Sequence, residues 1–229
     1  MLCFIDSANL DAIRECVEYY PVDGVTTNPT IISREKTAFT PLLRSIREII
    51  GNERLLHVQV TAAEAAGMIS EAREICETFG GNISIKIPIC REGLKATAAL
   101  KKEGIKVTTT AVFTPQQALI AAKAGASYVA PFVNRLDSVV GDGARIVAET
   151  VGLIEKYGFD CTTIAASFKN VEQVHRITLA GCPAMTLAPE LYKAIVEHPM
   201  TDCALDIFRS QWKGLYGDAT VPELIEKNM

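Results

Sequence analysis

Short apolar runs alternate with longer amphipathic stretches along the whole sequence. The runs are rich in β-branched and aliphatic residues and predict strands at residues 2–6, 24–28, 55–60, 83–88, 105–111, 128–133, 161–167 and 183–187. Helices are predicted between them, at residues 9–19, 40–50, 63–79, 92–102, 114–125, 142–157 and 171–180, with a short one from Pro189. Strands that alternate with helices are parallel, because each helix carries the chain back across the sheet.

About eight strand–helix units in 229 residues favour a closed barrel over an open sheet. We therefore expect an α/β fold, a single (β/α)8 TIM barrel domain over residues 1–229 with an extra C-terminal helix at residues 201–214. Leu205, Phe208 and Trp212 recur at helical spacing in that helix and give it one apolar face. The face either covers the barrel or docks on a neighbouring subunit, and we favour the second, which predicts a homo-oligomer.

The composition indicates which class of protein this is and which kinds of partner are excluded. Hydrophobic residues make up 48% and charged residues 22%, the balance of an ordinary soluble globular protein. A net charge of −4 argues against nucleic acid or an anionic membrane as the main partner. No run approaches a membrane span, and Asp6 interrupts the start too early for a signal peptide. The seven cysteines form no CxxC pair and the three histidines are scattered, so we expect reduced thiols, a cytoplasmic location, and neither metal nor cofactor.

The predicted strand at residues 83–88 carries a lysine in an isoleucine-rich run. Ile83, Ile85 and Ile87 alternate with Ser84, Lys86 and Pro88, so the lysine faces opposite to the isoleucines. An ammonium group that loses its hydration has a lowered pKa, and a neutral amine attacks ketones and aldehydes to form Schiff bases. The alternative is an edge strand whose lysine points into solvent.

Polar side chains collect at the predicted strand ends. Counting in twos back from each end puts one set on the inward face: Phe4 and Asp6, Thr26 and Asn28, His57 and Gln59, Ser84 and Lys86, Thr108 and Thr110, Ala130 and Phe132, and Ala165 and Ser167. The last inward residues of a barrel face the mouth where active sites lie. A carboxylate, amides, an amine and hydroxyls therefore converge on one rim.

These residues, in this order, resemble the transaldolase family, in particular its short members and the fructose-6-phosphate aldolases. The matching pieces are Asp6 and residues 24–29 (GVTTNP), 86–88 (KIP), 104–105 (GI), 110–113 (TAVF), 128–135 (YVAPFVNR) and 165–169 (AASFK). The resemblance covers nearly the whole chain. It implies an enzyme of carbohydrate metabolism, of the kind found in the pentose phosphate pathway, and ring-based oligomers such as decamers.

The resemblance implies specific catalytic and binding roles for Lys86 and the residues near it. The amine would form a Schiff base with a ketose, and Asp6 would take the proton of the C4 hydroxyl so that the C3–C4 bond breaks. A three-carbon enamine then stays on Lys86 until an aldehyde or a proton completes the cycle. Thr27 and Asn28 would bind substrate hydroxyls, although Asn28 alternatively caps the turn before Pro29.

Two positions each agree with one subgroup of the family and depart from the other: Gln59 resembles the fructose-6-phosphate aldolases, and Phe132 resembles the transaldolases. Gln59 and Thr110 would hold the catalytic water, but transaldolases usually have Glu at position 59, and fructose-6-phosphate aldolases have Tyr where Phe132 stands. Neither glutamine nor phenylalanine exchanges a proton with that water. An enamine that is protonated slowly has a longer lifetime and can react with an aldehyde instead, so we expect transfer to an acceptor such as glyceraldehyde 3-phosphate. The alternatives are an aldolase that releases free dihydroxyacetone and a catalytically silent barrel with a binding or assembly role.

The partner is expected to be a sugar phosphate or another anionic sugar. Arg135 and Ser167 match the family's phosphate-binding positions, and Lys169 either joins them or is a solvated surface lysine. Sulfonate presents similar oxygens, so a sulfo-sugar is also compatible with the set. His57, one inward step below Gln59, is interpreted as a packed, hydrogen-bonded histidine, with a proton relay to the water as the alternative.

Overall fold

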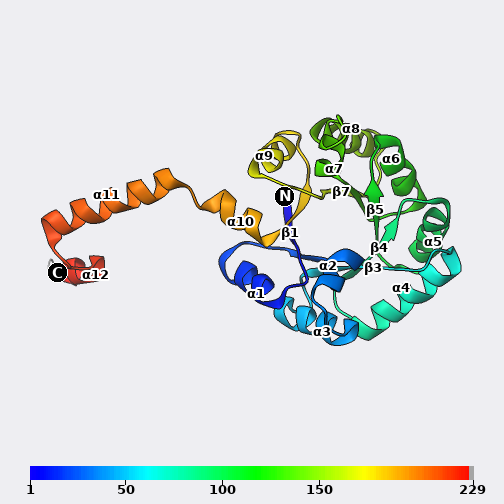
Figure 1. Ribbon diagram of the computed structural model, residues 1–229, viewed down its shortest axis with the longest axis horizontal. Helices are drawn as coiled ribbons and strands as arrows, with labels where there is room; N and C mark the ends of the chain where they lie inside the picture. Colours follow the sequence, from blue (N-terminus) through cyan, green and yellow to red (C-terminus); the bar gives the residue numbers. More distant parts are fainter. Residues whose placement is uncertain (227–229) are drawn as a thin grey trace. The chain divides into compact units, whose positions relative to one another are not determined.

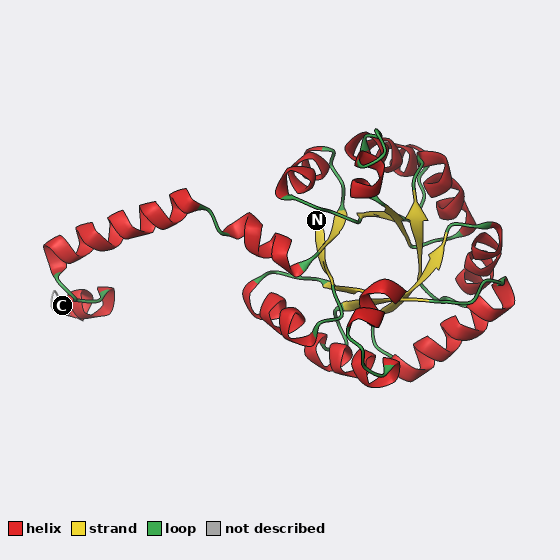
Figure 2. Cartoon of the chain, viewed as in Figure 1, coloured by secondary structure: helices red, strands yellow, loops and turns green. Residues whose placement is uncertain are grey.

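The computed structural model describes residues 1–226 and contains a closed barrel of eight parallel strands (Figure 2). Each strand pairs with the next along the chain, and the first pairs with the eighth. The strands are β1 (Leu2–Asp6), β2 (Gly24–Thr26), β3 (Leu55–Gln59), β4 (Ile83–Pro88), β5 (Val107–Val112), β6 (Tyr128–Pro131), β7 (Thr162–Ala165) and β8 (Ala184–Leu187). The (β/α)8 architecture expected from the sequence is confirmed.

Helices surround the ring of strands (Figure 1). They are α1 (Leu10–Tyr19), α2 (Pro29–Arg34), α3 (Phe39–Ile50), α4 (Ala65–Phe79), α5 (Arg91–Lys102), α6 (Pro115–Ala124), α7 (Val133–Asp137), α8 (Gly143–Lys156) and α9 (Val171–Leu179). The chain then continues into α10 (Pro189–Val196), α11 (Pro199–Tyr216) and α12 (Val221–Glu226). The Asn9 side chain accepts a hydrogen bond from the N–H of Ala12 and caps α1. The short helices α2 and α7 stand where the sequence pattern predicted only connections.

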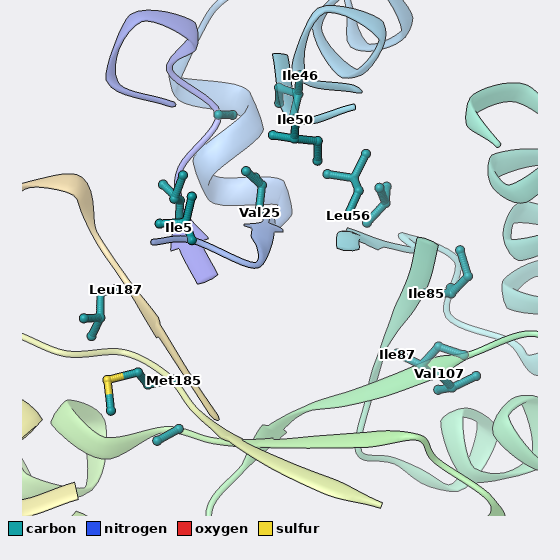
Figure 3. Close-up of a cluster of buried hydrophobic side chains, with 14 of the residues drawn as sticks. Ile5, Val25, Ile46, Ile50, Leu56, Ile85, Ile87, Val107, Met185 and Leu187 are labelled. Atoms are coloured by element: carbon teal, nitrogen blue, oxygen red, sulfur yellow. The ribbon is translucent and has the colours of Figure 1, made fainter. Parts of the chain in front are cut away.

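The main hydrophobic core lies between the outer face of the strands and the helices. Figure 3 shows outward residues of the strands, such as Ile5, Val25 and Leu56, near Ile46 and Ile50 of α3. A second, smaller set fills the inside of the barrel: Phe4, Leu55, Ile164 and Ala184, with Tyr128 packed against them. Apolar residues thus occupy the outward positions of each strand, which leaves the inward ends free for polar groups.

The seventh strand is out of phase with the sequence-based prediction. Ala165 belongs to the core between strands and helices, whereas Ile164 fills the inside of the barrel. The prediction that Ala165 and Ser167 share an inward face was therefore wrong for Ala165. The strand ends at Ala165, and Ser167 has a left-handed backbone with φ of +64°, so the two-residue alternation does not extend to it.

The described residues form two compact units, residues 1–192 and residues 193 onward. The first holds the barrel. The second begins in the last turn of α10 and holds α11 and α12. Within it the indole N–H of Trp212 donates to the carbonyl of Ala219 at 2.8 Å. Within residues 1–226, no helix combines the length and the apolar character that crossing a membrane requires. The single domain and the docking of residues 201–214 on another subunit stay predictions.

Candidate active site

A pocket of about 620 Å³ opens at the carboxyl ends of the barrel strands. Its lining includes nine of the ten side chains singled out from the sequence: Asp6, Asn28, Gln59, Lys86, Thr110, Phe132, Arg135, Ser167 and Lys169. They come from seven different strands or the connections that follow them. Barrel closure therefore brings to one place residues that are spread over more than 160 positions of sequence.

Lys86 lies on the inner face of β4 and is 5% exposed. Its Nζ donates a hydrogen bond to the main-chain carbonyl of Thr27 at 2.8 Å. Burial lowers the pKa of the Lys86 ammonium because the charged form loses hydration, and the carboxylate of Asp6 partly opposes this shift. The amine is enclosed and easier to deprotonate than a surface lysine, as the nucleophile of a Schiff base must be.

Asp6 ends β1 beside the same pocket. The Thr26 hydroxyl donates to its Oδ1 at 2.7 Å and lies 2.6 Å from the Thr186 hydroxyl. Burial raises the pKa of the Asp6 carboxyl, while Lys86, the Thr26 hydrogen bond and the charge of Arg34 each lower it in part. A carboxylate whose pKa is raised accepts a proton more readily than an exposed one, which suits an acid–base group.

Asn28 combines two interpretations that the sequence left as alternatives. Its side-chain oxygen accepts from the N–H of Ile31 at 2.9 Å and caps α2, with Pro29 in the first turn. The residue also lines the pocket. Since the cap uses the oxygen, the amide NH₂ is the part of Asn28 that remains to donate hydrogen bonds to a ligand.

Thr27 is not among the residues that line the pocket. It is fully buried, and both its N–H and its hydroxyl donate to the carbonyl of His57, at 3.0 and 2.8 Å. Its own carbonyl faces the amine of Lys86. The geometry gives Thr27 contact with the lysine, where the sequence suggested contact with the substrate.

Gln59 and Thr110 flank the lysine on either side. Gln59 ends β3 and pairs in register with Lys86, while Thr110 pairs in register with Pro88, two residues further along β4. A register shift between Thr109 and Val112, with Ala111 at φ +58°, marks this end of β5. An amide and a hydroxyl thus stand on the two neighbouring strands, where each can hydrogen-bond a small polar molecule at the base of the pocket.

Cationic groups gather after β6 and β7. The Arg135 guanidinium carbon lies 5.2 Å from the centre of the Phe132 ring, which also packs edge-on against Phe113 at 5.7 Å. The short helix α7 begins right after Phe132 and positions Arg135. With Ser167 and Lys169 on the same wall, this side of the pocket suits an anionic group.

His57 lies below the pocket and is completely buried. Its Nδ1 is 2.8 Å from the Thr108 hydroxyl, which is 2.7 Å from that of Ser84, and its ring packs edge-on against Phe4 and Tyr128. Burial, with the charge of Lys86 next, holds the His57 pKa well below its usual range. The ring is neutral and packed, which is the first of the two interpretations given above, and it does not line the pocket.

The pocket also contains residues that the sequence analysis did not select. Arg34, in the last turn of α2, and Thr186 of β8 both line it. The eighth strand was predicted to end at Leu187, so counting back in twos from that end selects Met185 and passes over Thr186. Arg34 depends on α2, whose six residues are too few to give a helical period.

No group of three or more His, Cys, Asp or Glu side chains is arranged to hold a metal ion within the described residues.

Comparison with known proteins identifies the family of this chain. Residues 3–227 match the family described as Transaldolase/Fructose-6-phosphate aldolase. A protein of Aquifex aeolicus (strain VF5), named a probable transaldolase, is 39% identical over 213 residues, which are 93% of this chain and 97% of that protein. The chain therefore belongs to the transaldolase/fructose-6-phosphate aldolase family.

Proposed function

We propose that this protein is a Schiff-base transaldolase, which transfers a dihydroxyacetone unit from an anionic ketose to an aldehyde acceptor such as glyceraldehyde 3-phosphate. The observation that carries the proposal is the enclosed amine of Lys86, whose pKa is lowered by burial, in one pocket with the carboxyl of Asp6. Membership of the family and a relative named a probable transaldolase support the same activity.

The pocket supplies the groups for each step. Nζ of Lys86 attacks the ketose carbonyl, and loss of water gives an iminium that withdraws electrons from the C3–C4 bond. Asp6 accepts the proton of the C4 hydroxyl, the bond breaks, and an aldehyde leaves while the enamine stays on Lys86. An incoming aldehyde is attacked by the enamine carbon, and Asp6 returns the proton to the new hydroxyl.

The substrate carries an anionic group at the end remote from Lys86. Arg135, held over Phe132, and the hydroxyl of Ser167 match an anion's oxygens, with Lys169 on the same wall. Phosphate fits this set, and sulfonate offers the same oxygens with less charge. Kinetics with phosphorylated and sulfonated ketoses, each with and without an acceptor, will identify the class.

Transfer is favoured over net cleavage because the water position lacks an acid–base partner. Gln59 and Phe132 stand where a carboxyl or a phenol would protonate the enamine. Phe132→Tyr should therefore raise the release of free dihydroxyacetone without an acceptor, and an enzymatic assay of that product measures it. If the wild-type protein releases dihydroxyacetone as fast as it transfers it, the second candidate, a fructose-6-phosphate aldolase-type enzyme, is correct.

Borohydride reduction tests the proposal itself. With a ketose phosphate, the protein should gain the mass of the reduced sugar adduct on Lys86, found by peptide mass spectrometry. Lys86→Met should gain none, with Lys95→Met, on the exposed surface of α5, as the control for unspecific labelling. If the wild-type protein forms no adduct with any ketose of the panel, the barrel is catalytically silent and the proposal fails.

Assembly and location complete the proposal. The exposed apolar side chains of α11, among them Leu205, Phe208 and Trp212, support a homo-oligomer, for which a decamer is the family-based expectation. A cytoplasmic location fits the seven free thiols, because the cytoplasm keeps cysteines reduced.

A further inference from the structure

The peptide group between Thr27 and Asn28 contacts the reactive lysine directly. Its carbonyl accepts the hydrogen bond from Lys86 Nζ at 2.8 Å. Lysine has four rotatable side-chain bonds, so an amine at the end of it needs a fixed partner to stay in one place. A main-chain carbonyl serves this purpose only if its own peptide group cannot rotate.

The structure holds that peptide group from both sides. On the N-terminal side, the N–H and the hydroxyl of Thr27 both donate to the carbonyl of His57. On the C-terminal side, Asn28 caps α2 through Ile31, and Pro29 restricts Asn28 to its extended backbone, with φ of −156° and ψ of 165°. Among these constraints, the hydrogen bond of the Thr27 hydroxyl can be removed by substituting a side chain that does not line the pocket.

A fixed carbonyl next to Nζ matters at two stages of Schiff-base formation. In the neutral amine, one N–H binds the carbonyl, so the lone pair is held in a defined direction for attack. Condensation then passes one amine proton and one solvent proton to the ketose oxygen, which leaves as water, and Nζ keeps a single N–H. That N–H carries part of the iminium charge, and a carbonyl oxygen in hydrogen-bond reach stabilises it.

We propose that Thr27 is a positioning residue of the Schiff-base lysine: its hydroxyl, bonded to the His57 carbonyl, fixes the Thr27 carbonyl that receives the N–H of Lys86 before and after imine formation. This inference rests on the proposed function. It changes the role that the sequence suggested for Thr27, from substrate binding to control of the nucleophile, and it explains why the residue is buried outside the pocket lining.

Two opposite changes at position 27 separate the hydroxyl from the methyl group. Thr27→Val keeps the shape and loses the hydroxyl, whereas Thr27→Ser keeps the hydroxyl and loses the methyl. The readout is the rate of borohydride-dependent labelling of Lys86 at saturating ketose phosphate, together with kcat and KM. We expect the valine variant to label roughly 10- to 100-fold more slowly, with kcat lowered and KM little changed, and the serine variant to label close to the wild-type rate.

Ligand binding without chemistry gives the second readout. In a Lys86→Met background, adding Thr27→Val should leave the dissociation constant for the ketose phosphate unchanged, because Thr27 does not line the pocket. A role in substrate binding predicts weaker binding instead and overturns the inference. Thermal unfolding checks that the variants fold. If the valine variant does not fold, Thr27→Ala, which also lacks the hydroxyl, replaces it in the same assays.

The possible outcomes distinguish this inference from the proposed function. Wild-type labelling with slow valine and fast serine variants supports both. Wild-type labelling with a valine variant as fast as wild type, or with a serine variant as slow as valine, overturns the positioning role and leaves the Schiff base intact. No labelling of the wild-type protein overturns the proposed function and this inference together.

Discussion

Asp6 and Lys86 are oppositely charged groups buried in one pocket, and each changes the other's titration. Burial raises the pKa of Asp6 and lowers that of Lys86, so both groups are shifted toward their neutral forms. Their mutual attraction works against both shifts, and the two protonation equilibria are therefore linked. Burial thus brings the proton affinities of the two groups closer together, which favours the proposed roles of Asp6 as acid–base group and of Lys86 as nucleophile.

The linkage predicts the effect of Asp6→Asn on the lysine. The carboxylate raises the pKa of Lys86, so its removal should lower that pKa further, and the acid limb of the borohydride-labelling rate should move to lower pH. Turnover should fall roughly 10²- to 10⁴-fold, because the variant lacks the proposed acid–base group but keeps the lysine proposed to form the Schiff base. Asp11→Asn, on the exposed surface of α1, is the control. An acid limb that stays in place or moves to higher pH contradicts the linkage.

Sequence reasoning at this scale finds side chains and misses main-chain groups. Lys86 and Asp6 were identifiable because strand alternation continues to the strand ends and sets their direction. The contact between Thr27 and Lys86 was not, since a carbonyl belongs to every residue and its orientation depends on a bond to His57, 30 positions away. Arg34 was missed for a different reason, because it lies on a helix that leaves no period in the sequence.

Closure of the barrel depends on close approach of neighbouring strands, and β2 and β3 approach each other closely at Gly24. A Cβ at this position would lie 1.9 Å from the carbonyl oxygen of Leu55, which is main chain and cannot move aside cheaply. The pairing of Gly24 with Leu55 sets the register that places Thr26 opposite His57. This glycine therefore fixes the strand that leads into the Thr27–Asn28 peptide.

Gly24→Ala should strongly destabilise the fold. The added methyl group must displace backbone within a buried sheet, so we expect a loss of roughly 3 kcal/mol or more in the free energy of unfolding. Gly152→Ala, in the middle of α8 with nothing within 4 Å of the added Cβ, should instead gain about 0.5–1 kcal/mol. Urea denaturation of both variants measures the difference, and equal stability of the two would contradict the packing argument.

Strands and long helices could be predicted because each carries several turns or alternations of its pattern. The same argument explains the failures. The helices α2 and α7 have six and five residues, too few for the helical period to repeat. The phase of β7 was wrong because the chain leaves the strand at Ala165, and nothing in the residue types of positions 165–167 records the left-handed turn at Ser167.

At the scale of the whole molecule, the second unit carries exposed apolar side chains on α11. In α11 the side chains of Leu205, Phe208 and Trp212 are exposed, Phe208 by 63%. Burying a large apolar side chain stabilises a complex by about 1.5–3 kcal/mol, so a row of them on one helix face favours association. A second copy of the chain is the occupant that the proposed homo-oligomer requires.

Substitution on that face should change the subunit count without changing the barrel. Leu205→Asp with Phe208→Asp places two charges in the apolar row, and light scattering coupled to gel filtration should then show a smaller particle than the wild-type oligomer. Ser210→Asp is the control for charge alone, because residue 210 lies on the opposite side of α11 and this substitution adds a negative charge there. Lys86 lies in the other unit, so borohydride labelling of the smaller particle should persist if each barrel holds a complete site. An unchanged particle mass in the doubly substituted protein, or a monomeric wild type, would show that this face does not join subunits, whereas loss of labelling on dissociation would mean that the pocket needs its neighbour.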